Sequence, residues 1–341
     1  MRVVVIGGTG FMSPHVVRGL VALGHEVTVV HRGQTEADLP EGVQHLHGDR
    51  DRLPDLIDQF RGIEPEVALN MIPFGAADTQ AFLAAFRGIA RRVVGISSQD
   101  VYRAYGRLWQ REFGPPDPIP VTEDSPLREQ LYPLRDVIPG GDTYDKILAE
   151  QEILGDPALP GTILRLPMVY GRLDGHRIFS YLKRMDDGRP SILLDEGLAR
   201  WQWSRGYVED VTTAIVRAVV DERAAGRVYN VAETDGLAEA DWVRRIGQAV
   251  GWTGEVIAVP SGRRPEKYPL DYRHHLVVDT TRIRRELGYR ERVDPAEALR
   301  RTIAWERESP PTEIDPTEYD YAREDEILAE LGAAGHFAWS A

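Results

Sequence analysis

Three glycines near the start of the chain form its clearest chemical motif. Gly7, Gly8 and Gly10 follow a strand-like run and precede a helix-like segment. Gly7 permits the tight turn, and Gly10 lets a pyrophosphate approach the backbone without a Cβ in the way. The helix that follows offers free N–H groups and a partial positive charge. We therefore predict a dinucleotide-binding turn made of Gly7, Gly8, Thr9, Gly10, Phe11 and Met12.

The next strand ends without the acid that commonly reads the adenosine ribose. It closes on His31 and Arg32, and Arg32 has the charge to pair with a 2′-phosphate, which mildly favours NADP(H) over NAD. A solvated surface arginine is the alternative. Asp49, beside Arg50, is placed either to meet the adenine amino group or to start a helix. The predicted cofactor contacts thus include His31, Arg32, Asp49 and Arg50.

These motifs need a scaffold, and the first half of the chain alternates apolar strand-like runs with helix-like runs. The expected strands are 3–6, 26–30, 67–72, 92–96 and 162–166, and the expected helices are 15–23, 53–60, 79–89 and 143–154. Such alternation predicts an α/β fold with a doubly wound parallel sheet of the Rossmann type.

The pattern changes twice along the chain. Residues 103–141 are rich in proline, which predicts a long insertion near the active site rather than a helix. Beyond residue 170, short elements alternate with charged helices. We therefore expect an NAD(P)-binding domain over 1–170 and a smaller, mainly substrate-binding region over 171–341. Some segments of that region should return to the first domain, and an acidic C-terminal extension begins near Pro310.

The composition excludes several kinds of site. The 341 residues include no cysteine, which rules out disulfides, thiolate zinc sites and cysteine nucleophiles. A formal net charge of −13 opposes binding to nucleic acid or an anionic membrane. No run is apolar enough for a membrane span, and neither a signal peptide nor a histidine cluster for a metal stands out. We expect a cytoplasmic protein that binds a small-molecule substrate.

Further motifs occur in the order and spacing of a known family. They are Gly48-Asp49, Ser97-Ser98 with Val101-Tyr102, Lys146 on a helix, the run Arg165 to Gly171, the run Tyr207 to Val211, Tyr229 to Val231, and Leu287 to Tyr289. Together with the glycine turn, they extend over roughly residues 1 to 306. The chain resembles the extended (atypical) short-chain dehydrogenase/reductases, in the NAD(P)-dependent epimerase/dehydratase family.

The resemblance implies hydride transfer at a nicotinamide cofactor, assisted by a serine, a tyrosine and a lysine. The tyrosine exchanges a proton with a substrate oxygen, and the serine orients that oxygen. The lysine binds the nicotinamide ribose and lowers the tyrosine pKa through its charge. Ser98 and Lys146 match the serine and the lysine, and Pro167 falls in a stretch that implies a cofactor contact.

The tyrosine departs from the family pattern. The family places it four residues before the lysine, one helical turn away, and Asp142 occupies that position. Tyr144 lies two residues before Lys146, which on a regular helix turns it roughly 200° away. Either irregular backbone at the helix start brings Tyr144 into the site, or Asp142 replaces it as general acid or base. An Asp ahead of a helix also fits an N-cap, which is the favoured role for Asp142.

Substrate contacts are expected from the insertion, the loop after Gly171, and the segment 201–205. The resemblance implies that arginines there hold a diphosphate, and tryptophans there have the surface to stack on a sugar. Surface exposure and core packing are the alternatives. The predicted substrate contacts are Ser98, Tyr102, Arg172, Trp203 and Arg205.

The sequence thus predicts an NAD(P)-dependent epimerase/dehydratase or reductase that acts on a sugar-like or small hydroxy/carbonyl substrate. The alternative is a dinucleotide-binding regulatory or scaffold protein without redox turnover, since Asp142 stands at the family's tyrosine position. The helices at 79–89 and 143–154 are candidate surfaces for a homodimer.

Overall fold

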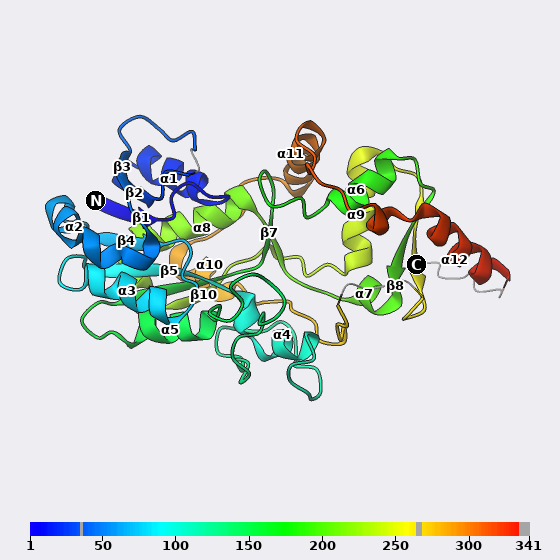
Figure 1. Cartoon of the computed structure of the whole chain (residues 1–341), viewed down its shortest axis with the longest axis horizontal. Coiled ribbons are helices and arrows are strands. Elements are labelled where there is room, and N and C mark those ends of the chain that lie inside the picture. Colours follow the sequence, from blue (N-terminus) through cyan, green and yellow to red (C-terminus); the bar gives the residue numbers. More distant parts are fainter. Residues whose placement is uncertain (35–36, 264–267, 334–341) are drawn as a thin grey trace.

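The computed structural model describes residues 1–34, 37–263 and 268–333. A seven-stranded sheet forms the centre of one half of the molecule, with the order β10-β6-β5-β4-β1-β2-β3 (Figure 1). Every strand pairing in it is parallel. The strands are β1 (Arg2–Ile6), β2 (Glu26–His31), β3 (Gln44–His47), β4 (Val67–Asn70), β5 (Arg92–Ser98), β6 (Gly161–Leu166) and β10 (Val228–Asn230). The predicted α/β fold with a doubly wound parallel sheet is confirmed.

Alternate side chains of β1 enter two separate cores, one on each face of the sheet. Val3 and Val5 pack in the core that also holds residues of α1 (Ser13–Ala22) and α8 (Val208–Val220). Val4 and Ile6 pack in the second core, beneath helices on the opposite face. Those helices are α2 (Ile57–Ile63), α3 (Ala76–Phe86) and α5 (Lys146–Gly155). Burial on both faces explains why the strands read as continuous apolar runs.

The other half of the molecule is built around two small parallel ribbons (Figure 1). One pairs β7 (Met168–Tyr170) with β9 (Arg205–Tyr207), and the other pairs β8 (Ser191–Asp195) with β11 (Glu255–Val259). The helices are α6 (Phe179–Asp186), α7 (Glu196–Arg200), α9 (Glu239–Val250), α11 (Pro295–Glu308) and α12 (Tyr321–Ala333). Because β10, α8 and α10 (Thr281–Leu287) pack with the main sheet, the first half is completed by residues beyond 170. The boundary at 170 stays a prediction.

The proline-rich insertion is more ordered than its composition suggests. It contains one short helix, α4 (Arg103–Leu108), which the sequence did not predict. Leu127 bridges Tyr102, and Val121 bridges Val278, so the insertion is joined both to the segment after β5 and to the segment before α10. Its helix α4 follows the carboxyl end of β5 after the short 3-10 helix Gln99–Val101.

Two predicted helices differ from the structure in ways that matter for the site. The segment 53–60 divides into a 3-10 helix, Arg50–Leu56, and α2, because Pro54 interrupts the regular pattern. The helix expected from Thr143 begins at Lys146, since Asp145 is its N-cap. Strand β3 was not predicted; its four residues are mostly exposed, so they lack the apolar pattern of the other strands.

Candidate active site

The glycine turn connects β1 to α1 with its backbone exposed toward the helix N-terminus. Gly7 has a φ of +84°, in the region that favours glycine. A Cβ on Gly8 would lie 2.6 Å from Cβ of Val29, so the turn packs directly on β2. A Cβ on Gly10 would meet nothing within 4 Å. Gly10 therefore borders open space, and the packing of the protein itself would allow a side chain at this position.

The first turn of α1 uses its own donors: N–H of Ser13 donates to the carbonyl of Gly10, those of His15 and Val16 donate to the carbonyl of Met12, and Pro14 has no N–H. Met12 occupies the N-cap position and makes no side-chain capping bond, while the Ser13 hydroxyl donates to the carbonyl of Gly7 at 2.6 Å. Ser13 thus holds the turn closed at the position where a third glycine is usual. In the described structure the N–H groups of Gly10, Phe11 and Met12, just ahead of the helix, have no acceptor. Such N–H groups beside an open glycine backbone fit a pyrophosphate, so the residues present fit a dinucleotide.

Histidines surround the end of β2, where a ribose is expected. Nε2 of His31 lies 2.9 Å from Nδ1 of His45, and the ring of His47 packs edge-on against His31. Arg32 is exposed, and among the described residues it has no ion-pair partner. No acid stands at this strand end in the sequence.

The residues at the end of β3 have structural roles that the sequence left open. Asp49 is the N-cap of the 3-10 helix, accepting from N–H of Asp51 at 3.1 Å. The guanidinium of Arg50 lies 5.2 Å from the centre of the Phe74 ring, which places it toward the catalytic residues. Contact of either residue with a cofactor stays a prediction.

Lys146 is the first residue of α5, and its ammonium group points back into the sheet. Nζ donates to the carbonyl of Pro73 at 2.5 Å and to that of Ile96 at 3.2 Å. Two of its three protons are used in this way, which leaves one for a ligand. Burial lowers the pKa of Lys146 to about 8, and Asp100 opposes that shift.

Tyr144 lies in irregular backbone ahead of α5, and this brings it beside Lys146. Nζ of Lys146 is 5.7 Å from the centre of the Tyr144 ring. The phenol hydroxyl donates to Oδ2 of Asp100. The regular-helix geometry that would turn Tyr144 away does not apply, because the helix begins only at Lys146.

Ser98 ends β5 and caps the short 3-10 helix Gln99–Val101. Its Oγ accepts from N–H of Asp100 at 3.2 Å. An accepting hydroxyl keeps its own proton free to donate. The capping role is therefore compatible with donation to a substrate oxygen.

The favoured role of Asp142 is wrong. Asp145, not Asp142, is the N-cap of α5. The side chain of Asp142 is 79% exposed and pairs with Arg135 at 3.3 Å. In the described structure it makes no recorded contact with Ser98, Tyr144 or Lys146, so the general acid or base proposed at this position has no structural support.

Two predicted substrate contacts are also corrected. Arg205 is 2% exposed, pairs with Glu239, and lies over the rings of Trp203 and Trp242. Tyr102 is buried as well, and its hydroxyl donates to Oδ1 of Asn230 at 2.6 Å. The hydroxyl of Tyr102 and both Nη atoms of Arg205 are bound inside the protein, and only Nε of Arg205 is buried without a partner in the described structure. Because both side chains are buried, their contact with a substrate has no support in the structure.

The other two predicted substrate contacts stay open. Nε1 of Trp203 donates to Glu239 at 2.9 Å, while its ring stacks on Trp201 and is only partly buried. Arg172 is exposed on the loop after β7. Burial lowers the pKa of His15 on α1, and Arg172 is close enough to add to that shift. Arg172 therefore lies on the side of the glycine turn.

One ion pair was missed by the sequence analysis although it positions the site. Arg128 and Asp145 are both fully buried and are joined by two bonds, of 3.0 and 3.1 Å. Asp145 also caps α5 and accepts from N–H of Tyr132 at 2.6 Å. The N-cap preference that suggested Asp142 fits Asp145 equally well, but the partner Arg128 gives no local signal.

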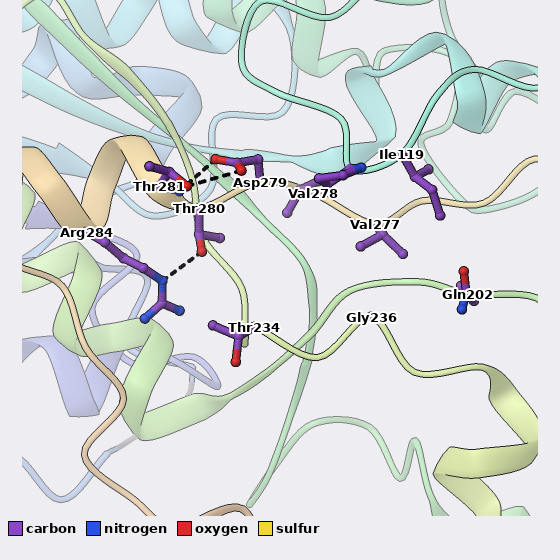
Figure 2. Close-up of a pocket in the computed structure, with 11 residues that line it drawn as sticks. Ile119, Gln202, Thr234, Gly236, Val277, Val278, Asp279, Thr280, Thr281 and Arg284 are labelled. Carbon is purple, nitrogen blue, oxygen red and sulfur yellow. Dashed lines mark hydrogen bonds between the residues drawn. The ribbon is translucent and has the colours of Figure 1, made fainter.

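A separate pocket of about 390 Å³ lies between the insertion and the segment 277–281 (Figure 2). Ile119 and Pro120 line one side, and Arg284 lies at the other. Arg284 donates to Oγ1 of Thr280 at 2.8 Å and also binds Glu291, so its donors are already used. None of the predicted site residues lines this pocket.

Two classes of site find no support within the described ranges. No group of three or more histidine or acidic side chains there is arranged to hold a metal ion. No helix there is long and apolar enough to cross a membrane.

Comparison with known proteins agrees with this geometry. The model of the NAD dependent epimerase/dehydratase family matches residues 3–232. A 2′-dehydrokanamycin reductase from Streptomyces kanamyceticus is 29% identical over 76% of this chain and 70% of the relative. A dTDP-glucose 4,6-dehydratase from Streptomyces niveus is 26% identical over 91% of this chain and 94% of the relative. The structure of a Thermus thermophilus UDP-glucose 4-epimerase with NAD matches with a TM-score of 0.66 and 22% identity, covering 91% of this chain and 100% of that one.

Proposed function

Because this chain belongs to the NAD dependent epimerase/dehydratase family, we propose that it catalyses hydride transfer at a hydroxyl or carbonyl carbon of a sugar-like substrate, with NADP(H) preferred over NAD. It is an oxidoreductase-type enzyme, since its relatives include a reductase and a dehydratase. The observation that carries the proposed chemistry is the placement of Tyr144 beside Lys146, at the carboxyl end of β5 with Ser98.

Each of the three residues has a distinct role in this proposal. When bound, the nicotinamide supplies or accepts the hydride. Tyr144 holds the proton that moves to or from the substrate oxygen, and the free proton of Ser98 orients that oxygen. Lys146 uses its remaining N–H for the cofactor ribose, while its bonds to Pro73 and Ile96 keep the ammonium in place.

The preference for NADP(H) rests on the end of β2. Arg32 is exposed there without an ion-pair partner among the described residues, and no acid is present to repel a 2′-phosphate. The exposed ring of His47 lies at the same surface, whereas both ring nitrogens of His31 are already bound, one to N–H of Gly33 and the other to His45. A strand end of this composition suits a phosphate better than a bare ribose.

A binding-only role is not favoured. It was motivated by Asp142 at the family's tyrosine position, and Tyr144 compensates for that change by approaching Lys146 from irregular backbone. The reductase that matches 76% of this chain and the dehydratase that matches 91% of it are named as enzymes.

The first experiment tests cofactor binding. The melting temperature is measured with NAD, NADH, NADP and NADPH in turn, and a cofactor at one hundred times its Kd should stabilise the fold by about 2.7 kcal/mol. Absence of a shift with all four would contradict the proposal. Turnover is then assayed with the substrates named for the relatives: 2′-dehydrokanamycin with NADPH, and UDP-glucose or dTDP-glucose with NAD and NADP.

A further inference from the structure

The carboxyl group of Asp100 is buried in the candidate active site with one oxygen unpaired. The residue is 6% exposed. Oδ2 accepts from the hydroxyl of Tyr144, whereas Oδ1 is buried and has no hydrogen-bond partner in the described structure. A buried polar atom without a partner costs about 1–3 kcal/mol, and such atoms are kept in proteins where they have a use.

Charged and titratable groups face Asp100 from each element around it. Tyr144 and Lys146 come from the start of α5, Tyr105 from α4, and Arg128 from the insertion. Arg128 binds the backbone carbonyl of Asp100 at 2.8 Å, but its guanidinium is paired with Asp145. Within the described residues, no cation forms an ion pair with the Asp100 side chain.

This environment favours a carboxyl group that keeps its proton. Burial raises the pKa of Asp100, against the opposing influence of Tyr144, Arg128 and Lys146. Burial also raises the pKa of Tyr144 well above its ordinary value, and the neighbouring Asp100 adds to that shift. Because the hydroxyl of Tyr144 donates to Oδ2 of Asp100, the Asp100 carboxyl group is in place to replace a proton that Tyr144 gives up.

We propose that Asp100 is the proton-holding partner of Tyr144: its carboxyl group replaces the proton that the phenol gives to the substrate oxygen. Asp100 is a positioning residue in this scheme, because it acts through Tyr144 and does not touch the substrate. The inference rests on the proposed function and deepens it, since it names the group that supplies the proton.

The step balances for reduction of a carbonyl group. The carbonyl carbon gains a hydride from the reduced cofactor, and the carbonyl oxygen gains the proton of the Tyr144 hydroxyl. Because Oδ2 accepts from Tyr144, the carboxyl proton of Asp100 is on Oδ1. Once Tyr144 has given up its own proton, rotation of the carboxyl group brings this proton to the Tyr144 oxygen, and the resulting Asp100 carboxylate regains a proton from water. Oxidation of an alcohol runs through the same bonds in reverse.

The test that needs no substrate is a pH titration of tyrosinate absorbance. The difference in tyrosinate absorbance between the wild type and the Tyr144→Phe variant reports the ionisation of Tyr144 alone. At the high pH where Tyr144 ionises, Asp100 has already lost its proton, and a neighbouring carboxylate shifts a pKa by about 1–3 units. The absorbance difference measured in an Asp100→Asn background should therefore appear about 1–3 pH units lower. Asp58→Asn, which removes an exposed carboxylate from α2, is the matched control and should leave the titration unchanged. An unshifted Tyr144 in the Asp100→Asn background would overturn the proposal.

The kinetic test separates proton holding from structural support. Asparagine keeps the size of Asp100 and can accept the Tyr144 hydrogen bond, but it cannot hold the proton. We expect Asp100→Asn to lower kcat on the order of 100-fold, to remove the fall of kcat with rising pH, and to leave the Kd for NADPH unchanged. If the Asp100→Asn variant kept the kcat and the pH profile of the wild type, Asp100 would have a structural role only, and the proposal would be overturned.

The outcomes also distinguish this inference from the proposed function. If no cofactor binds, the proposed function fails, yet the tyrosinate titration still decides whether Asp100 and Tyr144 share a proton. If the Asp100→Asn variant does not fold, the absorbance difference between the wild type and Tyr144→Phe is decisive by itself. Ionisation of Tyr144 near the ordinary pKa of tyrosine would contradict the pairing with Asp100.

Discussion

The glycine turn and the start of α5 are built in opposite ways. At the turn, consecutive residues determine the geometry: Gly7 takes a positive φ, and Ser13 bonds back to the Gly7 carbonyl. At α5, the positions of Tyr144 and Lys146 depend on Asp145, which pairs with Arg128 in the insertion. The difference teaches that a site made by local backbone can be predicted from its sequence, whereas a site assembled by distant side chains cannot.

The largest expected effect comes from the assembled site. Tyr144→Phe removes the proposed proton donor and should lower kcat on the order of 10²- to 10⁴-fold, with little change in cofactor affinity. The measurement is steady-state kinetics with whichever substrate the turnover assay identifies. Asp142→Asn is the matched control, because that carboxylate is exposed and pairs with Arg135. A greater loss in Asp142→Asn than in Tyr144→Phe would reverse our assignment.

Removal of the charge on Asp145 should destabilise the same region. Asp145→Asn leaves Arg128 buried and unpaired, which we expect to lower the free energy of unfolding by about 3–5 kcal/mol. Asp294→Asn is the control, since Asp294 caps α11 from an exposed position, and Asn caps as well as Asp. Urea denaturation measures the free energy of unfolding of both variants. Equal losses would mean that capping, rather than the buried ion pair, holds the start of α5.

Two alanine substitutions distinguish the glycine that is needed for packing from the glycine that is expected to contact the cofactor. Gly8→Ala places a Cβ against Val29 and should cost about 1–3 kcal/mol of stability. Gly10→Ala meets open space, so its free energy of unfolding should stay near that of the wild type while its Kd for NADPH rises. Denaturation and fluorescence titration with NADPH are compared for both variants. Wild-type affinity in Gly10→Ala would show that the cofactor does not pass over Gly10.

The smallest effect is expected at Arg32. Arg32→Ala removes an exposed cation, and an exposed ion pair contributes about 1 kcal/mol at most. The Kd for NADPH should therefore rise about fivefold, which corresponds to that free energy, while the Kd for NADH stays unchanged. Equal Kd changes for both cofactors would remove the proposed preference for NADP(H).

The sequence was sufficient for the fold and for the position of the glycine turn, because both rest on local patterns, while cofactor contact at that turn stays a prediction. Apolar runs of four to six residues predicted five of the seven strands of the main sheet. The other two were missed: the side chains of β3 are mostly exposed, and β10 has only three residues. Ser98 and Lys146 were identified by their motifs. Asp100 and Arg128 were not, since neither the unpaired oxygen of the first nor the buried partner of the second is visible before the insertion is folded onto α5.

The insertion's two attachments limit how substrate preference can be exchanged between relatives. Bonds from Asp145 hold Arg128 and Tyr132 to α5, and the bridge from Val121 holds the insertion to Val278. A chimera that replaces all of residues 103–141 would leave a buried carboxylate without its cation. A transplant confined to the outer part of the insertion, around the exposed Phe113, keeps that pairing. The transferable unit is therefore smaller than the insertion itself.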